Sequence, residues 1–68
     1  MKIEQYLKET KTSQSKFCKG LEEATGQALS QGGLSKYVTG VRIPRRSEMK
    51  AIHQFTGGKV TPNDFFLD

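Results

Sequence analysis

Residues 30–40, SQGGLSKYVTG, predict one short helix whose start and end are both marked. Serine is a preferred helix cap because its hydroxyl accepts a hydrogen bond from a free backbone N–H group, so Ser30 marks the start. Gly40 marks the end, since glycine readily adopts the left-handed backbone that often follows a helix. Apolar side chains recur here at helical spacing and are expected to face the rest of the domain: Leu34, Tyr37, Val38 and Val41.

Two further helices are predicted before this segment. Residues 2–9 form a short amphipathic helix, because Ile3, Tyr6 and Leu7 fall on one face. A second helix is expected to start after Thr12 or Ser13 and to stop at Gly26. Its expected inward side chains are Phe17, Leu21 and Ala24.

Two more helical segments are predicted after residues 30–40. Pro44 interrupts the helical pattern in RIPRR, because proline has no backbone N–H group to donate. Ser47 is the expected cap of the next helix, EMKAIHQF, which two glycines end. In TPNDFF, Thr61 is the expected cap, Pro62 the first helical residue and Asp64 the acid three positions after the cap. The expected inward side chains of the longer helix are Met49, Ile52 and Phe55.

The 68 residues are expected to form a single all-α domain, a compact bundle of four to five helices. No segment alternates apolar and polar residues for long enough to predict a sheet. No apolar run approaches the roughly 20 residues that cross a bilayer, and no basic-then-apolar leader opens the chain. The single cysteine, Cys18, has no partner for an internal disulfide. We therefore expect a cytoplasmic protein without membrane contact.

The positive charge of the chain is concentrated in one segment. Residues 30–50 carry five cations and one acid, Glu48, whereas six lysines balance six acids in the remainder. A surface without a charged partner usually mixes both signs, so a local surplus favours a polyanionic partner. The five cations are Lys36, Arg42, Arg45, Arg46 and Lys50.

Several segments together resemble the helix-turn-helix regulators of the phage Cro and repressor type. The resemblance lies in SQSKF, in SQGGLSKYVTG followed by VRIP, and in GGKVTPNDFF, and it spans most of the chain. It implies a lambda-repressor-like DNA-binding domain in which the helix of residues 30–40 reads double-stranded DNA. It also implies that Gln14, which opens the second helix, contacts a phosphate.

The face of this helix opposite its apolar stripe supplies the candidate DNA contacts. Gln31 is suited to a paired contact with adenine, and Lys36 can donate to the acceptors of guanine. The arginines that follow are expected to bind phosphates, because they lie near the rim of the groove. The outward residues of the helix are Gln31, Gly32, Ser35, Lys36 and Thr39, and the arginines are Arg42, Arg45 and Arg46.

One departure from the family pattern concerns the residues between Phe17 and Ser30. About six additional residues lie there, within CKGLEEATGQALS. Either the second helix is longer by a turn or more, or the connection to the third helix is enlarged. The acids Glu22 and Glu23 should face away from DNA, since like charges repel.

Sequence-specific recognition of DNA by one short helix usually requires two copies on a pseudopalindrome, so we expect a homodimeric repressor. The segment 60–68 is the expected dimer contact, by resemblance and because adjacent phenylalanines are hard to bury in so small a domain. The contact residues are Val60, Phe65, Phe66 and Leu67. The alternative is a protein-binding module, such as an antitoxin or adaptor of the same fold.

An enzyme is not expected. His53 has no neighbouring metal ligand or catalytic partner in the sequence, and Cys18 is expected to be a small buried side chain. TGGKV lacks the first glycine and the hydroxyl of a phosphate-binding loop. We expect no metal, no cofactor and no small-molecule substrate.

Overall fold

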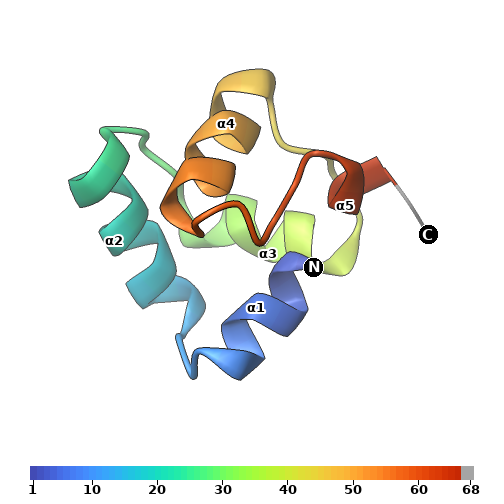
Figure 1. Cartoon of the computed structure of the whole chain (residues 1–68), viewed down its shortest axis with the longest axis horizontal. Helices are drawn as coiled ribbons and strands as arrows, with labels where there is room; N and C mark the ends of the chain where they lie inside the picture. The colour runs from blue at the N-terminus through green and yellow to red at the C-terminus, as the bar shows by residue number, and fades with distance from the viewer. Residues whose placement is uncertain (67–68) are drawn as a thin grey trace.

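A computed structural model describes residues 1–66, and these residues form five helices and no strand. Figure 1 shows α4 in front of α3, with α2 at the left and α1 below them. The all-helical prediction is confirmed. The helices are α1 (Ile3–Glu9), α2 (Gln14–Thr25), α3 (Gln31–Thr39), α4 (Arg46–Phe55) and α5 (Asn63–Phe66).

The core forms where α2 packs against both α3 and α4. Three aromatic rings extend it toward α1: Phe17 contacts Tyr6 and Phe55 edge to face, with ring centroids 6.1 and 5.4 Å apart. Edge-to-face pairs add favourable electrostatics to the burial of the rings. The largest fully buried side chains come from three helices and the segment before α5: Phe17, Leu21, Leu34, Ile52 and Val60.

The two central helices begin and end where the sequence predicts. The Ser13 hydroxyl accepts a hydrogen bond from the Lys16 N–H group at 3.1 Å, and α2 ends at Gly26 with a φ of 78°. Ser30 caps α3 in the same way, and Gly40 ends it with a φ of 79°. These boundaries follow from local chemistry, because both capping bonds span three residues.

The predicted starts of the last two helices are wrong by one or two residues. Ser47 lies inside α4, and the cap position is Arg45, whose N–H group donates to Glu48 Oε1 at 2.9 Å. The acid of the first turn thus takes the capping role that the Ser47 hydroxyl was expected to fill. α5 begins at Asn63, so Pro62 precedes the helix.

Two side chains that were predicted to face inward are exposed. The buried residues of α2 end at Leu21, so Ala24 in the last turn lies outside the core. Val41 keeps 73% of its surface exposed. It follows Gly40, whose left-handed backbone ends the helix, so the helical spacing no longer directs Val41 inward.

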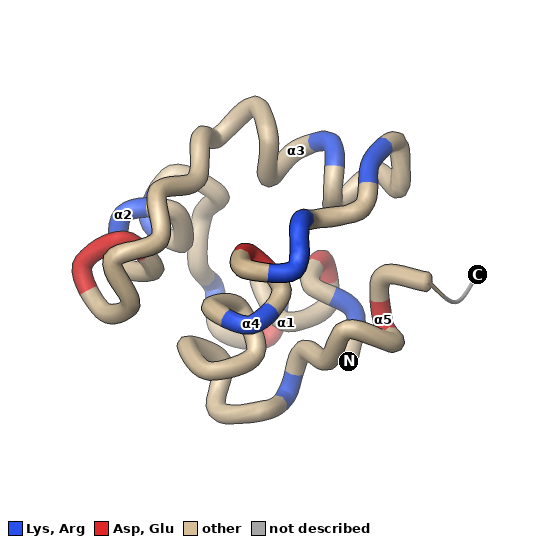
Figure 2. Tube along the Cα trace, turned by 90° about the horizontal axis from the view of Figure 1, so that it is seen from above, with Lys and Arg blue, Asp and Glu red and all other residues tan. Residues whose placement is uncertain are grey.

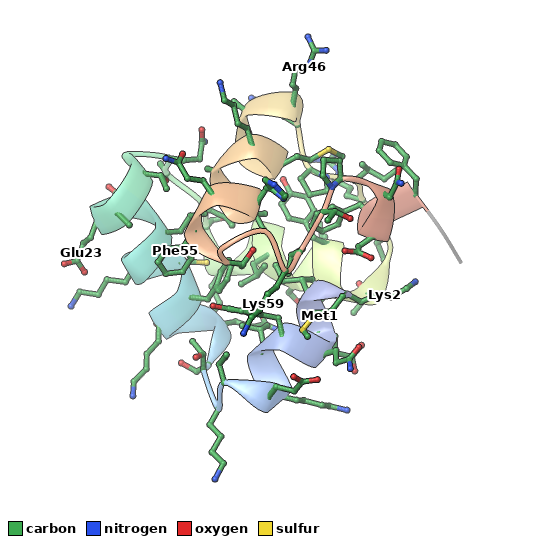
Figure 3. The ribbon with its side chains drawn as sticks, in the orientation of Figure 1. Met1, Lys2, Glu23, Arg46, Phe55 and Lys59 are labelled. Carbon is green, nitrogen blue, oxygen red and sulfur yellow. The ribbon has the colours of Figure 1, made fainter. Side chains whose placement is uncertain are left out.

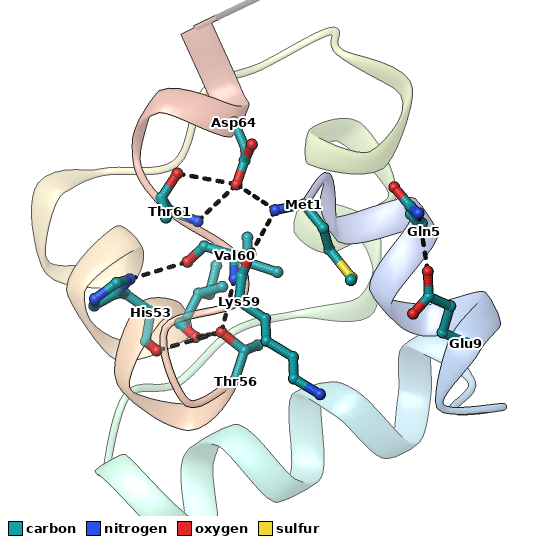
Figure 4. Close-up of polar contacts among 10 residues, drawn as sticks. Met1, Gln5, Glu9, His53, Thr56, Lys59, Val60, Thr61 and Asp64 are labelled. Atoms are coloured by element: carbon teal, nitrogen blue, oxygen red, sulfur yellow. Dashed lines mark hydrogen bonds and ion pairs between the residues drawn. The ribbon is translucent and has the colours of Figure 1, made fainter.

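The two ends of the described chain are joined at α5 (Figure 4). The Met1 ammonium lies 3.0 Å from Asp64 Oδ2, which also accepts the Thr61 N–H group at 2.8 Å and the Thr61 hydroxyl at 3.0 Å. The Thr61 N–H group, the ammonium and the hydroxyl all favour the ionised form and hold the pKa of Asp64 below its ordinary value. α5 is therefore fastened by charged hydrogen bonds at its first turn.

The segment between α4 and α5 closes the core. The Val60 N–H group donates to the Thr56 hydroxyl at 3.1 Å, and that hydroxyl donates to the Ile52 carbonyl at 2.8 Å. Val60 is fully buried, with a relative exposure of 0%. The prediction that Val60 contacts a second copy is therefore wrong, because its side chain is enclosed by its own domain. Within residues 1–66, the helices are too short or too polar to cross a membrane.

Candidate nucleic-acid interface

The outer face of α3 carries polar side chains on an anchored helix. Leu34 is fully buried and fixes the helix on the core, while Tyr37 and Val38 are half-buried beside it. Ser35 is also half-buried, so less of its hydroxyl reaches the surface than predicted. The other four predicted contact residues of this face are exposed: Gln31, Gly32, Lys36 and Thr39.

The Thr39 hydroxyl is already used within the helix. It donates to the Ser35 carbonyl at 3.1 Å and lies 3.3 Å from the Lys36 carbonyl. A hydroxyl has one hydrogen and two lone pairs, so Thr39 remains able to accept a hydrogen bond. A donated bond to a phosphate would require its rotation. Thr39 is therefore better suited to an amino group of a base than to the DNA backbone.

The chain leaves α3 along a fixed path. The N–H groups of Val41 and Arg42 both donate to the Lys36 carbonyl, at 2.9 and 3.3 Å, and Gly40 N donates to the Tyr37 carbonyl at 3.3 Å. These bonds satisfy carbonyls that the end of a helix otherwise leaves free. The backbone that carries Arg42 is therefore held directly against the end of α3.

A clasp of three residues holds the start of α4 against the end of α3. The Tyr37 hydroxyl donates to Glu48 Oε1 at 2.8 Å, and the same oxygen accepts the Arg45 N–H group at 2.9 Å. Burial, and then the hydrogen bond and the charge of Glu48, raise the pKa of Tyr37 above its ordinary value of 10.0. Tyr37 therefore remains a neutral donor at neutral pH. Pro44, in the middle of the connection, is buried.

The arginines of this connection are free of acidic partners within residues 1–66. Arg42, Arg45 and Arg46 are exposed, and the ion pairs of the described chain are formed instead by Met1 with Asp64 and by Lys8 with Glu4. The acid of the segment, Glu48, is held by Tyr37 and the Arg45 backbone. The guanidiniums of this surface thus form no ion pair with the acids of residues 1–66.

The surplus of positive charge lies over one part of the molecule, although α2 also carries a blue segment and red segments lie near α1 and α4 (Figure 2). Figure 2 shows blue segments at the end of α3, in the connection that follows and along α4, whereas a red segment on α2 lies at the other side of the molecule. In Figure 3, the Glu23 side chain projects from α2 at the left and Arg46 from the top of α4. The expectation that Glu22 and Glu23 face away from DNA stays a prediction, and of the two acids Figure 3 shows Glu23 projecting away from Arg46.

Gln14 is the first residue of α2 and is half-buried. The capping bond at this helix start is made by the Ser13 hydroxyl, so the Gln14 side chain is not the cap of α2. The residues between Phe17 and Ser30 are divided between α2 and the connection that follows it. α2 extends to 12 residues, and residues 26–30 connect it to α3.

The remaining predicted residues lie elsewhere. Phe65 is half-buried against the core, Phe66 is 60% exposed, and Leu67 lies outside the described residues. Cys18 is buried as expected, and burial raises the pKa of its thiol. His53 is exposed, with Nδ1 3.2 Å from the Val60 carbonyl oxygen.

Sequence reasoning missed the clasp and two exposed apolar residues. Tyr37 was expected only to fill the core, although a tyrosine that is partly buried usually needs a hydrogen-bond partner. This requirement indicates that the Tyr37 hydroxyl has a hydrogen-bond partner, but it does not identify Glu48 as that partner. Ile43 is 50% exposed and, with Val41, flanks Arg42.

Comparisons with protein families, with curated proteins and with solved structures give no match to this chain. The site is therefore interpreted from its own residues and geometry.

Proposed function

We propose that this protein is a sequence-specific double-stranded DNA-binding regulator of transcription, most simply a Cro-like repressor of phage or prophage type. The observation that carries the proposal is the exposed polar face of α3, which continues directly into three exposed arginines without acidic partners in the described chain. DNA offers a groove for the helix and a row of phosphates for the guanidiniums.

In this proposal, α2 and α3 act as a helix-turn-helix with an extended first helix and a connection of residues 26–30. α3 enters the major groove, which is about 12 Å wide, while Leu34 keeps it on the core. Gln31 and Lys36 read base edges from the exposed face. Arg42, Arg45 and Arg46 bind phosphates beside the groove, and the clasp between Tyr37 and Glu48 fixes their distance from α3.

Recognition of a pseudopalindrome requires two copies of the chain, one on each half-site. A stable interface usually buries about 800 Å² on each partner. In the predicted dimer contact, Val60 is enclosed and Phe65 packs against the core. Among residues 1–66, this leaves Phe66 as the exposed large apolar side chain of that contact. We therefore propose that the two copies pair weakly and come together on adjacent half-sites of the DNA.

Selection of bound duplexes from a random pool tests this function most directly. The expected result is a motif with two inverted half-sites about one helical turn apart. Gln31→Ala and Lys36→Gln should each relax the preference at a separate base position, because each side chain reads a different base. The proposal would be excluded if the recovered duplexes share no sequence motif and if their binding does not depend on salt.

The second candidate function, a protein-binding module, is favoured by one observation. Ile43 and Phe66 are 50% and 60% exposed, and with Val41 they are the exposed large apolar side chains of residues 1–66. Light scattering of the purified chain and gel shifts with random duplex at low and high salt separate the two functions.

A further inference from the structure

An apolar groove lies between the connection after α3, the outer side of α4 and the segment that leads into α5. Ile43 and Pro44 form one side of the groove, Met49 lies on α4, and Phe66 closes the side toward α5. Ile43 and Phe66 are 50% and 60% exposed, so their apolar surfaces face solvent. Covering this surface would be favourable at about 25 cal/mol for each Å² removed from water.

The rim of the groove is basic. Arg46 and Lys50 both line it from α4, and their spacing of four residues places them on the same face of that helix. No acid lines the groove among the described residues, and neither cation forms an ion pair there. His53, one turn further along α4, also borders the groove. The occupant should therefore present carboxylates beside apolar side chains.

We propose that this groove binds an acidic amphipathic segment of another protein. An apolar side chain of that segment would lie between Ile43 and Phe66, over Met49, while its carboxylates pair with Arg46 and Lys50. An amphipathic helix with apolar residues at i, i+3 or i+4 and i+7 meets this requirement in a groove formed by helices.

A second copy of this chain fits the same groove less well. A two-fold pairing brings the same patch of both molecules together, so the cations of both copies would enter one interface. Residues 1–66 place no acid in the lining of this groove to neutralise them, and like charges in an interface are unfavourable. Charge complementarity therefore favours an acidic partner over self-association.

One consequence rests on the proposed DNA-binding function. Arg46 belongs both to the groove rim and to the predicted phosphate contacts. An acidic segment in the groove would then compete with DNA for this guanidinium and weaken operator binding. The occupant would act as an inhibitor of the regulator.

Binding can be measured by fluorescence anisotropy of a labelled helical peptide that carries leucines at the spacing above and glutamates beside them. Two matched peptides serve as controls, one with lysines in place of the glutamates and one with serines in place of the leucines. We expect the acidic amphipathic peptide to bind at least tenfold more tightly than either control. Amide chemical shifts should change around Ile43, Met49 and Phe66.

Variants at exposed positions connect this binding to the groove. Lys50→Glu and Phe66→Ser should each weaken peptide binding at least fivefold. Lys19→Glu, on α2, and Val41→Ser, an exposed apolar residue outside the groove lining, are the matched controls and should leave binding unchanged. All four side chains are exposed, and thermal unfolding of each variant verifies that the fold is kept.

Equal binding of all three peptides, or shift changes confined to another surface, would overturn the proposal. Self-association that Phe66→Ser abolishes, without peptide binding, would assign the groove to a second copy instead. The competition is tested separately with a selected duplex. Peptide binding without any DNA binding refutes the proposed function alone, and DNA binding without peptide binding refutes the groove assignment alone.

Discussion

Two glycines that lie inside helices, Gly20 and Gly32, have opposite surroundings, which the sequence alone does not reveal. A Cβ atom on Gly20 of α2 would lie 2.9 Å from Cζ of Phe55, which is closer than carbon atoms approach in proteins. Figure 3 shows the Phe55 ring between α4 and α2. A Cβ atom on Gly32 of α3 would meet no atom within 4 Å. Gly20 is therefore needed for packing within the domain, whereas Gly32 leaves free space outside it.

Gly20→Ala should destabilise the domain. Although alanine favours helices, the added methyl group must displace the Phe55 ring, which also contacts Phe17 at a centroid distance of 5.4 Å. Overpacking of this kind costs about 1–3 kcal/mol, which exceeds the gain in helix propensity of about 1 kcal/mol. Urea unfolding followed by circular dichroism measures the difference. A more stable variant would show that Phe55 moves aside without loss.

Gly32→Ala should separate stability from function. The open surroundings allow the methyl group, and the change should leave the free energy of unfolding equal or raise it by up to about 1 kcal/mol. If α3 lies in the groove of DNA, the same methyl group reduces how closely the backbone approaches, and affinity for a selected duplex falls. Unchanged affinity would place this turn of α3 away from the DNA.

At the scale of the elements, α4 is held by its buried side chains against α2, and two polar contacts add to this at the start of α4 and at α5. The Tyr37 hydroxyl reaches from α3 to Glu48 in α4, and Asp64 of α5 reaches the Met1 ammonium. Single hydrogen bonds contribute about 0.5–1.5 kcal/mol, which is a considerable part of the stability of so small a domain. These polar contacts therefore add directional constraints to the packing of the hydrophobic core.

Tyr37→Phe tests the clasp between α3 and α4. The variant keeps the ring and removes the hydroxyl, so it should lose about 1 kcal/mol of stability. It should also bind DNA more weakly at every sequence, because Arg42, Arg45 and Arg46 are no longer held at a fixed distance from α3. Serine at Val41, which is exposed nearby, is the control and should affect stability little. If Tyr37→Phe binds DNA with wild-type affinity, the clasp contributes to stability but not to DNA binding.

Asp64→Ala tests the fastening of α5 and has a defined pH dependence. The charged hydrogen bonds keep the folded-state pKa of Asp64 below its ordinary value of 3.8, so their contribution is present above that pH and is lost as the pH falls through the lowered value. We expect a loss of about 1 kcal/mol at pH 7 that shrinks at acidic pH. Thermal melts of the wild-type chain and of Asp64→Ala, from pH 7 to acidic pH, measure this difference in stability. A difference that stays constant with pH would assign the effect to packing.

At the scale of the whole molecule, the positive charge is the property that bears most directly on function. The surplus of four charges lies within residues 30–50, and its arginines have no acidic partners among residues 1–66. Electrostatic binding of this kind releases counterions from DNA, so affinity should fall steeply with salt.

The salt dependence gives a count of phosphate contacts. If about four cations each neutralise one phosphate, the slope of log affinity against log salt is near −4, at roughly −0.9 per contact. Replacing Arg42, Arg45 and Arg46 one at a time by glutamine should reduce the magnitude of the slope by about one each. Glutamine at Lys11 or Lys59, outside the basic segment, should leave it unchanged. A slope near zero in the wild-type chain is incompatible with this interface.

The helices and most of the core could be predicted because they depend on neighbours in the sequence. Ser13, Ser30, Gly26 and Gly40 act on backbone groups within a few residues, and the spacing of Phe17, Leu21, Leu34 and Ile52 follows from helix geometry. The outward face of α3 was predictable for the same reason. The concentration of positive charge was visible directly in the residues.

Features that depend on which segments meet in space could not be predicted from local sequence patterns. Val60 is buried, and its N–H group donates to the Thr56 hydroxyl, whereas the resemblance placed it in a C-terminal segment expected to contact a second copy. The partner of Tyr37, the close approach of Phe55 to Gly20 and the basic groove beside Phe66 each join distant parts of the chain. Local chemistry alone thus determined where the two central helices begin and end and which faces of the helices are mainly apolar. Tertiary packing decided which apolar residues stay exposed and which polar groups meet.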